Sequence, residues 1–207
     1  QQPPFGIIST PVYHLLGHDY LYPDPMNLVI MPDNHDMSRI FTQVDEDADL
    51  WRIAMVFYAT MRGIPQIYYG TEIQMSHPGT DSHGAIREEF PGGWDDHEKN
   101  AFTGEGLTEQ ELAAQDFTRK LLNWRKQADV IHSGKLMQYT PIGNVYAYFR
   151  YDEDDTVMVV FNLDEDAIDL ELARFAERLA GATQARDVLA DRSIDLGVGG
   201  GPGAGPD

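Results

Sequence analysis

Hydrophobic positions in the first half of the chain alternate between short continuous runs and helical spacing. Residues 27–31 form an apolar run between two prolines, which predicts a short strand buried on both faces. Residues 50–61 carry a wide apolar face after an acidic start, and Gly63 is a suitable stop, so we expect a helix of about four turns. A second strand-like run follows at residues 65–70.

Residues 71–106 form a long segment without regular hydrophobic spacing. Segments of this length in a compact domain are usually functional or disordered, and the aromatic anchors Phe90 and Trp94 favour an ordered one. Thr108 and Glu111 then form a capping box, which predicts a helix that ends near residue 131. The order strand, helix, strand, helix is typical of a parallel α/β fold.

Beyond Gly134 the pattern changes to short strands separated by turn residues. Residues 145–151 and 156–161 flank an acidic turn, which predicts a β-hairpin. Further along the chain we expect two weaker strands with a helix between them, at residues 168–172, 185–189 and 173–179.

These patterns place a domain boundary near residues 132–135. The expected parts are an α/β unit, an antiparallel β-sandwich domain and a disordered tail, at residues 1–133, 134–196 and 197–207. The tail holds six glycines and two prolines in eleven residues. Before the first strand we expect loop, with one helical turn around residues 13–17.

The composition is that of a globular protein, with 207 residues and 42% hydrophobic side chains. No stretch approaches the roughly 18 consecutive apolar residues of a membrane helix. The N-terminal Gln-Gln-Pro-Pro lacks the basic and apolar regions of a signal peptide. We therefore expect a soluble chain that does not bind membranes, and the compartment, periplasm or cytoplasm, stays open. The absence of cysteine excludes disulfides, thiol catalysis and cysteine-based zinc sites.

The net charge of −19 disfavours binding to nucleic acid, because phosphate would be repelled. Of the 34 acidic residues 22 are aspartate, and only four of the 15 basic residues are lysine. Such a surface suggests a protein adapted to high salt, where counterions screen the repulsion between carboxylates.

The strongest chemical constellation is Asp33, Asn34, His35 and Asp36, followed by Arg39. It lies just past the C-terminal end of the first predicted strand, which is the face where α/β barrels build active sites. Carboxylates, an amide, an imidazole and a guanidinium so close together supply the charge and directed hydrogen bonds that polyhydroxylated substrates require. The alternative is an ordinary polar loop in which Asp33 or Asp36 caps a helix.

Three motifs resemble signatures of one enzyme family. Residues 31–36, Met-Pro-Asp-Asn-His-Asp, resemble the fourth signature region of the α-amylase family of glycoside hydrolases (family 13), in which Asn-His-Asp follows barrel strand seven. Residues 63–72 resemble the same family's strand-eight region. Residues 87–94 resemble a stretch of the neopullulanase and cyclomaltodextrinase branch. The motifs occur in the family's order, and the resemblance covers about residues 20–190.

The resemblance implies the C-terminal part of a TIM (β/α)8 barrel, strands seven and eight, followed by the family's antiparallel β-sandwich domain. It also implies a retaining glycosidase that acts on α-1,4 or α-1,6 linkages of an α-glucan or maltooligosaccharide. In this family the nucleophile is an Asp after strand four and the acid/base is a Glu after strand five, and neither strand is present in this sequence. We therefore expect the isolated chain to be inactive and to need the missing N-terminal barrel portion.

Carried over residue by residue, Asp36 matches the family's third carboxylate, which binds sugar hydroxyls and distorts the ring towards the transition state. His35 matches the imidazole that binds the sugar at the cleavage point. Asn34 and Arg39 are expected to orient the loop or pair with carboxylates, and Arg39 could also reach a sugar. Trp94, with Phe90, is a candidate aromatic platform under a sugar ring, as against a simple loop anchor.

Other polar groups give weaker signals. His14 and His18 are four residues apart but lack the neighbouring Glu of a metal-binding helix. The acidic turns at residues 152–155 and 164–166 lack the glycine and final glutamate of a calcium loop. Glu72 follows a strand, but the family pattern makes it a structural residue. We expect no metal and no cofactor.

A second function stays open at this stage, a non-catalytic carbohydrate-binding or structural module. Its β-sandwich, residues 135–196, would pack against the α/β remnant. Calorimetry with maltooligosaccharides separates such a module from an inert fragment, because millimolar or tighter binding by the lone chain supports a module.

Overall fold

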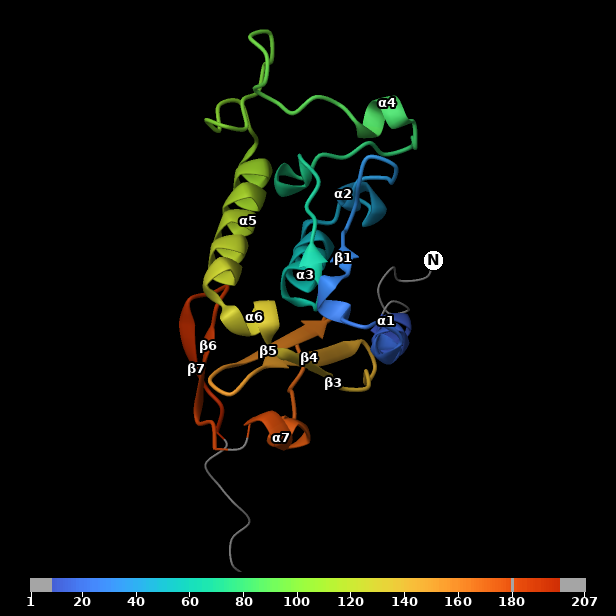
Figure 1. Cartoon of the computed structure of the whole chain (residues 1–207). Helices are drawn as coiled ribbons and strands as arrows, with labels where there is room; N and C mark the ends of the chain where they lie inside the picture. The colour runs from blue at the N-terminus through green and yellow to red at the C-terminus, as the bar shows by residue number, and fades with distance from the viewer. Residues whose placement is uncertain (1–8, 180, 198–207) are drawn as a thin grey trace, which may run out of the picture.

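The computed structural model describes residues 9–179 and 181–197. Figure 1 shows an elongated molecule, with the helices α3 and α5 beside a short parallel strand pair in one half and an antiparallel sheet in the other. Within the described residues, none of the helices combines the length and apolar character that a membrane crossing needs. Disorder is expected for residues 197–207, of which residues 198–207 lie outside the described part of the chain.

The parallel pair consists of β1 (Val29–Ile30) and β2 (Ile64–Pro65), with Val29 opposite Ile64. Both strands are shorter than the apolar runs predict, and the burial on both faces expected for the first strand is wrong. Val29 is 52% exposed and Ile64 is 51% exposed. The reason is that each strand has a single partner among the described residues, so the outer edges and one face have no neighbour to cover them.

The helix α3 (Ala48–Thr60) connects the two parallel strands. Asp47 caps it, because its side chain accepts hydrogen bonds from the amides of Asp49 and Leu50 at 2.8 and 2.9 Å. The acidic residues at 45–47 therefore precede the helix, and the short helix α2 (Ile40–Gln43) lies before them. The apolar face of α3 buries Trp51, whose ring packs against Phe117 of the next long helix.

The capping box predicts the start of α5 (Glu109–Gln127) correctly. The Thr108 hydroxyl accepts from the amide of Glu111 at 3.2 Å, and the Glu111 carboxylate accepts from the amide of Thr108 at 2.7 Å. The helix ends earlier than expected, at a break around Ala128, and a short helix α6 (Asp129–Ser133) follows.

The C-terminal part is rich in antiparallel β-structure. The predicted hairpin is confirmed as β4 (Val145–Tyr151) and β5 (Thr156–Asn162), and β3 (Lys135–Gln138) pairs with the other edge of β4. A separate hairpin consists of β6 (Gln184–Asp187) and β7 (Arg192–Asp195).

The strand expected at residues 168–172 is wrong. This segment has no strand pairing, and it leads into a 3-10 helix, η4 (Leu172–Phe175), and the helix α7 (Ala176–Leu179). Its side chains Leu170 and Leu172 pack against the cluster around Phe149 and Phe175. The hydrophobic residues of this segment therefore cover the sheet instead of joining it. At the other end of the chain, the expected helical turn is the helix α1 (Ser9–Leu16).

The two halves share a core at the end of α3. Tyr148 and Phe161 of the sheet belong to the same buried cluster as Met61. The hydroxyls of Tyr148 and Thr60 are 2.5 Å apart. Arg150 is fully buried and donates to the carbonyls of Thr60 at 3.1 Å and Gly134 at 2.8 Å. The guanidinium thus joins the C-terminal ends of α3 and α6 to the sheet. A positive charge is favourable at the C-terminal end of a helix.

Candidate functional site

The loop after β1 begins with a carboxylate that is structural. Asp33 is completely buried, and it accepts from the amide of Ile40 at 2.9 Å and from the Thr71 hydroxyl at 2.9 and 3.0 Å. Burial raises the pKa of Asp33 above its ordinary value, although these hydrogen bonds and the charge of Arg39 act in the opposite direction. Of the two aspartates that the sequence offered as caps, Asp33 is the one that accepts from the first amide of α2, although the N-cap position itself is Arg39.

Asn34 shapes the turn that follows. Its side-chain oxygen accepts from the amide of Asp36 at 2.8 Å, and its amide nitrogen lies 3.1 Å from the sulfur of Met31 and 3.4 Å from that of Met37. These contacts fold the loop back on itself, so that the next two side chains turn outward.

Asp36 stands at the centre of an exposed cluster of charged and titratable groups. One carboxylate oxygen lies 2.8 Å from Arg87 Nη2 and 4.0 Å from His83 Nδ1, and the other lies 3.2 Å from His35 Nε2. The side chains of Asp36 and His35 are 58% and 62% exposed. The carboxylate is thus oriented by neighbours and still open to solvent on one side, which a group that binds a ligand requires.

Arg87 and His83 are the members of this cluster that sequence reasoning missed. His83 belongs to α4 (His83–Ile86), which lies near the loop after β1 (Figure 1). Arg87 also donates to the carbonyl of His35 and to His83 Nδ1, at 2.8 and 2.9 Å. Arg87 is 51 residues from Asp36 along the chain, so only the fold brings them together. The one available signal was its position at the start of the third motif.

Arg39 is buried beneath this loop. Its Nε donates to the carbonyl of Ile86 at 2.9 Å and its Nη1 donates to the carbonyl of Tyr69. The guanidinium lies over the rings of Tyr68 and Tyr69, 4.3 and 4.8 Å from their centroids. The side chain has no exposed surface. Full burial leaves the guanidinium no surface on which a sugar could lie, so the expected contact of Arg39 with a sugar does not fit this structure, and its supporting role stays a prediction.

The remaining candidates lie in the segment after β2. Burial raises the pKa of Glu72, in the 3-10 helix η3 (Thr71–Ile73). Trp94 is 63% exposed on the loop before α5. The Phe90 ring packs against Tyr69 and Phe102, with centroids 6.5 and 5.1 Å away, and the ring contacts of the described residues include none between Phe90 and Trp94.

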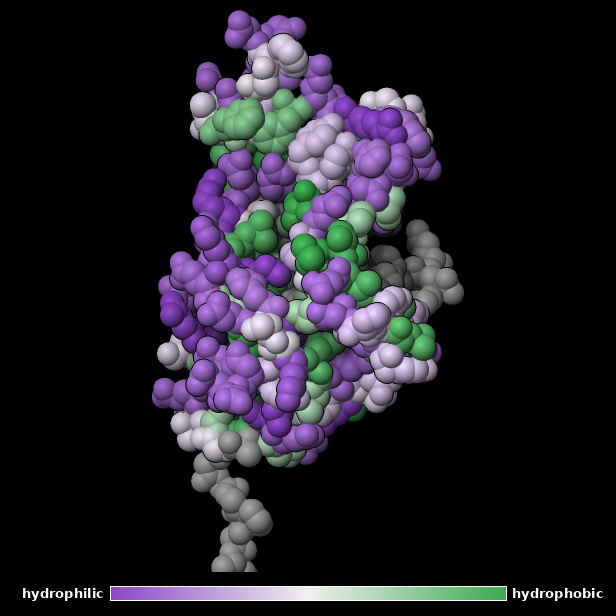
Figure 2. All heavy atoms as spheres, in the orientation of Figure 1, coloured by the Kyte–Doolittle hydropathy of each residue, from purple (hydrophilic) through white to green (hydrophobic). Residues whose placement is uncertain are grey.

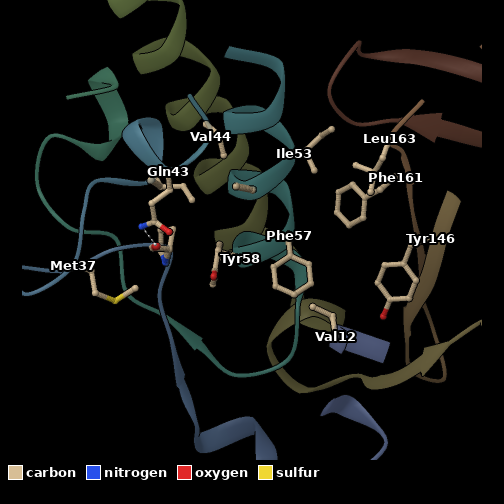
Figure 3. Close-up of a pocket in the computed structure, with 13 residues that line it drawn as sticks. Val12, Met37, Gln43, Val44, Ile53, Phe57, Tyr58, Tyr146, Phe161 and Leu163 are labelled. Atoms are coloured by element: carbon tan, nitrogen blue, oxygen red, sulfur yellow. Dashed lines mark hydrogen bonds between the residues drawn. The ribbon is translucent and has the colours of Figure 1, made fainter. Parts of the chain in front are cut away.

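An apolar cavity of about 280 Å³ lies between α3 and the three-stranded sheet. In Figure 3, Phe57 of α3 faces Tyr146 and Phe161 of the sheet across it, with Val12 of α1 at one side. Its walls are mainly hydrocarbon, so it offers few of the polar groups that orient a sugar. Within residues 9–179 and 181–197, no group of three or more His, Asp or Glu side chains is placed to hold a metal ion.

Comparisons with known proteins give consistent matches. The sequence model of the alpha amylase catalytic domain matches residues 17–157, and that of the cyclo-malto-dextrinase C-terminal domain matches residues 136–198. A cyclomaltodextrinase of a Bacillus species is 28% identical over 137 residues, which cover 64% of this chain and 21% of that protein. Neopullulanase 2 of Thermoactinomyces vulgaris is 30% identical over 146 residues, which cover 69% of this chain and 22% of that protein.

A crystal structure of AmyP in complex with maltose shares the fold, with a TM-score of 0.71 and 20% identity over 91% of this chain and 40% of that one. The chain therefore spans about a fifth of the two relatives and two fifths of this structure. The matches and the observed elements together show part of a TIM barrel followed by a C-terminal β-rich domain.

Proposed function

This chain belongs to the α-amylase family of glycoside hydrolases, in its cyclomaltodextrinase and neopullulanase branch, and from that membership we propose that it is the C-terminal portion of a retaining α-glucan glycosidase. The proposed reaction is hydrolysis of α-1,4 or α-1,6 glucosidic bonds. The observation that carries the proposal is the position of Asp36, exposed and oriented just past a parallel barrel strand, within the family's Asn-His-Asp motif.

In a retaining glycosidase one carboxylate attacks the sugar and a second, about 5–5.5 Å from the first, protonates the leaving oxygen and later activates water. In this family these two carboxylates follow barrel strands four and five. The strands of this chain match strands seven and eight, so we assign the nucleophile and the acid/base to a barrel portion outside the given sequence. The isolated chain is then expected to turn over no maltooligosaccharide.

Asp36 is proposed to act as the third carboxylate. Positive charge develops on the sugar ring in the oxocarbenium-like transition state, and hydroxyls next to that charge become better hydrogen-bond donors. A carboxylate that accepts from those hydroxyls is therefore bound more tightly in the transition state than in the ground state, and this lowers the barrier. His35, in contact with Asp36 at 3.2 Å, is proposed to bind the same sugar.

Arg87 and Asn34 are proposed as positioning residues for Asp36. Arg87 fixes one carboxylate oxygen and the carbonyl of His35, and Asn34 fixes the Asp36 amide. Arg39 holds the underlying segments together through the carbonyls of Tyr69 and Ile86.

The substrate class rests on the relatives. The structure with a TM-score of 0.71 holds maltose, and the family branch is named after α-glucan substrates. We therefore propose an α-glucan or a maltooligosaccharide as the ligand of the Asp36 cluster.

The test is to sequence the transcript upstream of the codon for Gln1. The proposal predicts an open frame that encodes further strand and helix units, with an Asp after the fourth strand and a Glu after the fifth. A stop codon followed by a start codon directly before Gln1 would overturn it. Turnover of maltoheptaose by the purified, homogeneous chain would equally contradict the assignment of the nucleophile to another part of the barrel.

A further inference from the structure

Three aromatic rings form a continuous row on the segment that leads from β2 to α5. Tyr69 contacts Phe90 edge to face, and Phe90 contacts Phe102 in the same way. We call these three residues the aromatic ridge. Phe102, at its outer end, is 74% exposed, and Tyr69 is 37% exposed. Figure 2 shows hydrophobic side chains gathered on the loop that precedes α5, surrounded by hydrophilic ones.

The loop that carries Phe102 is held by many hydrogen bonds. The side chain of Asn100 accepts from the amides of Phe102 and Thr103 at 2.9 and 3.1 Å, and the Asn100 amide donates to the carbonyl of Glu105 at 2.8 Å. The amide of Gly104, whose φ is 83°, donates to the carbonyl of Asn100 at 2.8 Å. The outward position of Phe102 is therefore fixed by a built turn.

The base of this turn is equally well anchored. Gln115 of α5 donates to the carbonyl of Ala101 at 2.8 Å, and the amide of Gly92 donates to His97 at 2.9 Å. A Cβ on Gly92 would lie 2.6 Å from the side-chain oxygen of Asn100, so the segments of the loop around these two residues are in close contact. An exposed ring on a rigid support loses little conformational entropy when it binds a ligand.

The ridge is physically continuous with the candidate site. The hydroxyl of Tyr69 donates to the carbonyl of Glu88 at 2.8 Å. One residue earlier, Arg87 contacts Asp36 and His35. The segment 87–90 thus begins at the Asp36 cluster and ends at the middle ring of the ridge.

The charges around the ridge favour a neutral ligand. Acidic side chains surround it in the sequence and are exposed in the structure: Glu88, Glu89, Asp95, Asp96 and Glu105. The nearby cations are already paired, Lys99 with Glu111 at 2.7 Å and Arg87 with Asp36 at 2.8 Å. Anionic ligands are therefore repelled, whereas carboxylates accept hydrogen bonds from neutral hydroxyls.

We propose that the aromatic ridge is a binding surface for an α-glucan chain, with Phe102 as its principal contact. The apolar C–H face of a sugar ring packs on the face of Phe102, and the acidic rim accepts from the outward hydroxyls. The ridge holds sugar units away from the cleavage point and guides the chain towards Asp36. This inference rests on the α-glucan substrate class of the proposed function and adds a residue and a surface to it.

The experiment is calorimetric titration of the whole 207-residue chain with maltoheptaose, because every ridge residue lies within it. The variants are Phe102→Ala and, as a matched control, Tyr20→Ala, which removes a ring that is 79% exposed away from the ridge. We expect Phe102→Ala to raise the Kd for maltoheptaose about tenfold, because the variant lacks the ring that the sugar would cover. Tyr20→Ala is expected to bind like the wild type, and Phe102→Trp is expected to retain binding.

Equal affinity of Phe102→Ala and the wild type for maltoheptaose would overturn the proposal that the aromatic ridge binds an α-glucan chain. So would the absence of any binding of maltoheptaose to the wild-type chain at millimolar concentration. The upstream reading frame tests the glycosidase proposal separately, so failure of the ridge can be told apart from failure of the proposed function. Thermal unfolding of each variant shows that it is folded, and Phe102→Ala should unfold like the wild type because the lost ring is largely exposed.

Discussion

Asp33 and Asp36 are three residues apart in one loop, and the fold gives their carboxylates opposite surroundings. Asp33 is buried and bonded to Ile40 and Thr71, whereas the Asp36 side chain is 58% exposed next to Arg87. The residue types and their spacing place both aspartates in the loop, but the sequence could not decide which one bonds to the helix α2. The deciding contacts come from Thr71 and Arg87, 38 and 51 residues away along the chain.

The first prediction concerns the cost of burying Asp33. Its native pKa lies above the ordinary value of 3.8, so the native state binds the proton more tightly than the unfolded chain does. The contribution of this group to the free energy of unfolding therefore falls as pH rises through and above 3.8. In Asp33→Asn this dependence is absent, and urea unfolding from pH 4 to 7 should show the stability of the variant rising relative to wild type.

Asp33→Ala provides the control for this prediction. It removes the acceptor and leaves the Ile40 amide and the Thr71 hydroxyl without a partner, which should cost about 1–3 kcal/mol at pH 7. Asn keeps an acceptor and should cost less. The account of Asp33 fails if Asn and Ala destabilise the protein equally, or if the stability difference between Asp33→Asn and the wild type does not change with pH.

At the scale of elements, the features predicted correctly are those that local residues determine. The capping box fixes the start of α5, and the hairpin of β4 and β5 follows from two apolar runs around an acidic turn. The parallel strands are different, since each ladder depends on a distant partner, and both are shorter than predicted. The segment at residues 168–172 shows the same limit of local prediction. Its hydrophobic residues pack against the sheet and form no strand pairing.

The second prediction tests the cap of α5. Thr108→Ala removes the acceptor for the Glu111 amide, and it should lower the free energy of unfolding by about 1 kcal/mol. Thr108→Ser keeps the hydroxyl and should restore most of this loss. Urea denaturation of the three proteins is the measurement. Equal stability of the Ala variant and the wild type would show that the cap contributes nothing.

At the scale of the whole molecule, the junction between the barrel part and the sheet combines the shared apolar core with a buried cation, Arg150. Burial lowers the pKa of Arg150 to about 10, so it is still charged at neutral pH. Its Nη1 and Nη2 donate to carbonyls at the ends of α3 and α6. The sequence places an arginine inside a strand of apolar residues but gives no sign of these partners, because Thr60 and Gly134 lie 90 and 16 residues away along the chain.

The third prediction follows from this junction. Arg150→Ala leaves the carbonyls of Thr60 and Gly134 buried without their donor and opens a cavity, so unfolding should become easier by at least about 3 kcal/mol. The matched control is Arg52→Ala, which removes an exposed pair with Asp49 and should cost less than about 1 kcal/mol. Similar losses for the two variants, measured by urea unfolding, would argue against a structural role for Arg150.

The fourth prediction concerns the charge of the whole chain. With a net charge of −19, the carboxylates of the native state repel one another, and salt should weaken this repulsion. The melting temperature should therefore rise between low salt and about 1 M NaCl, where the Debye length is about 3 Å. Sorbitol at equal osmolality controls for effects that do not involve charge. A melting temperature that stays constant or falls in NaCl would refute adaptation to high salt.

The most direct test of the central claim is the turnover of maltoheptaose by the product of the complete reading frame that contains this chain, with and without Asp36→Asn. If Asp36 is the third carboxylate, kcat should fall by at least about 100-fold, because a group that stabilises the transition state is lost. The control Asp116→Asn changes another exposed aspartate, on α5, and should leave kcat unchanged. Wild-type turnover by the Asp36→Asn enzyme would contradict the account.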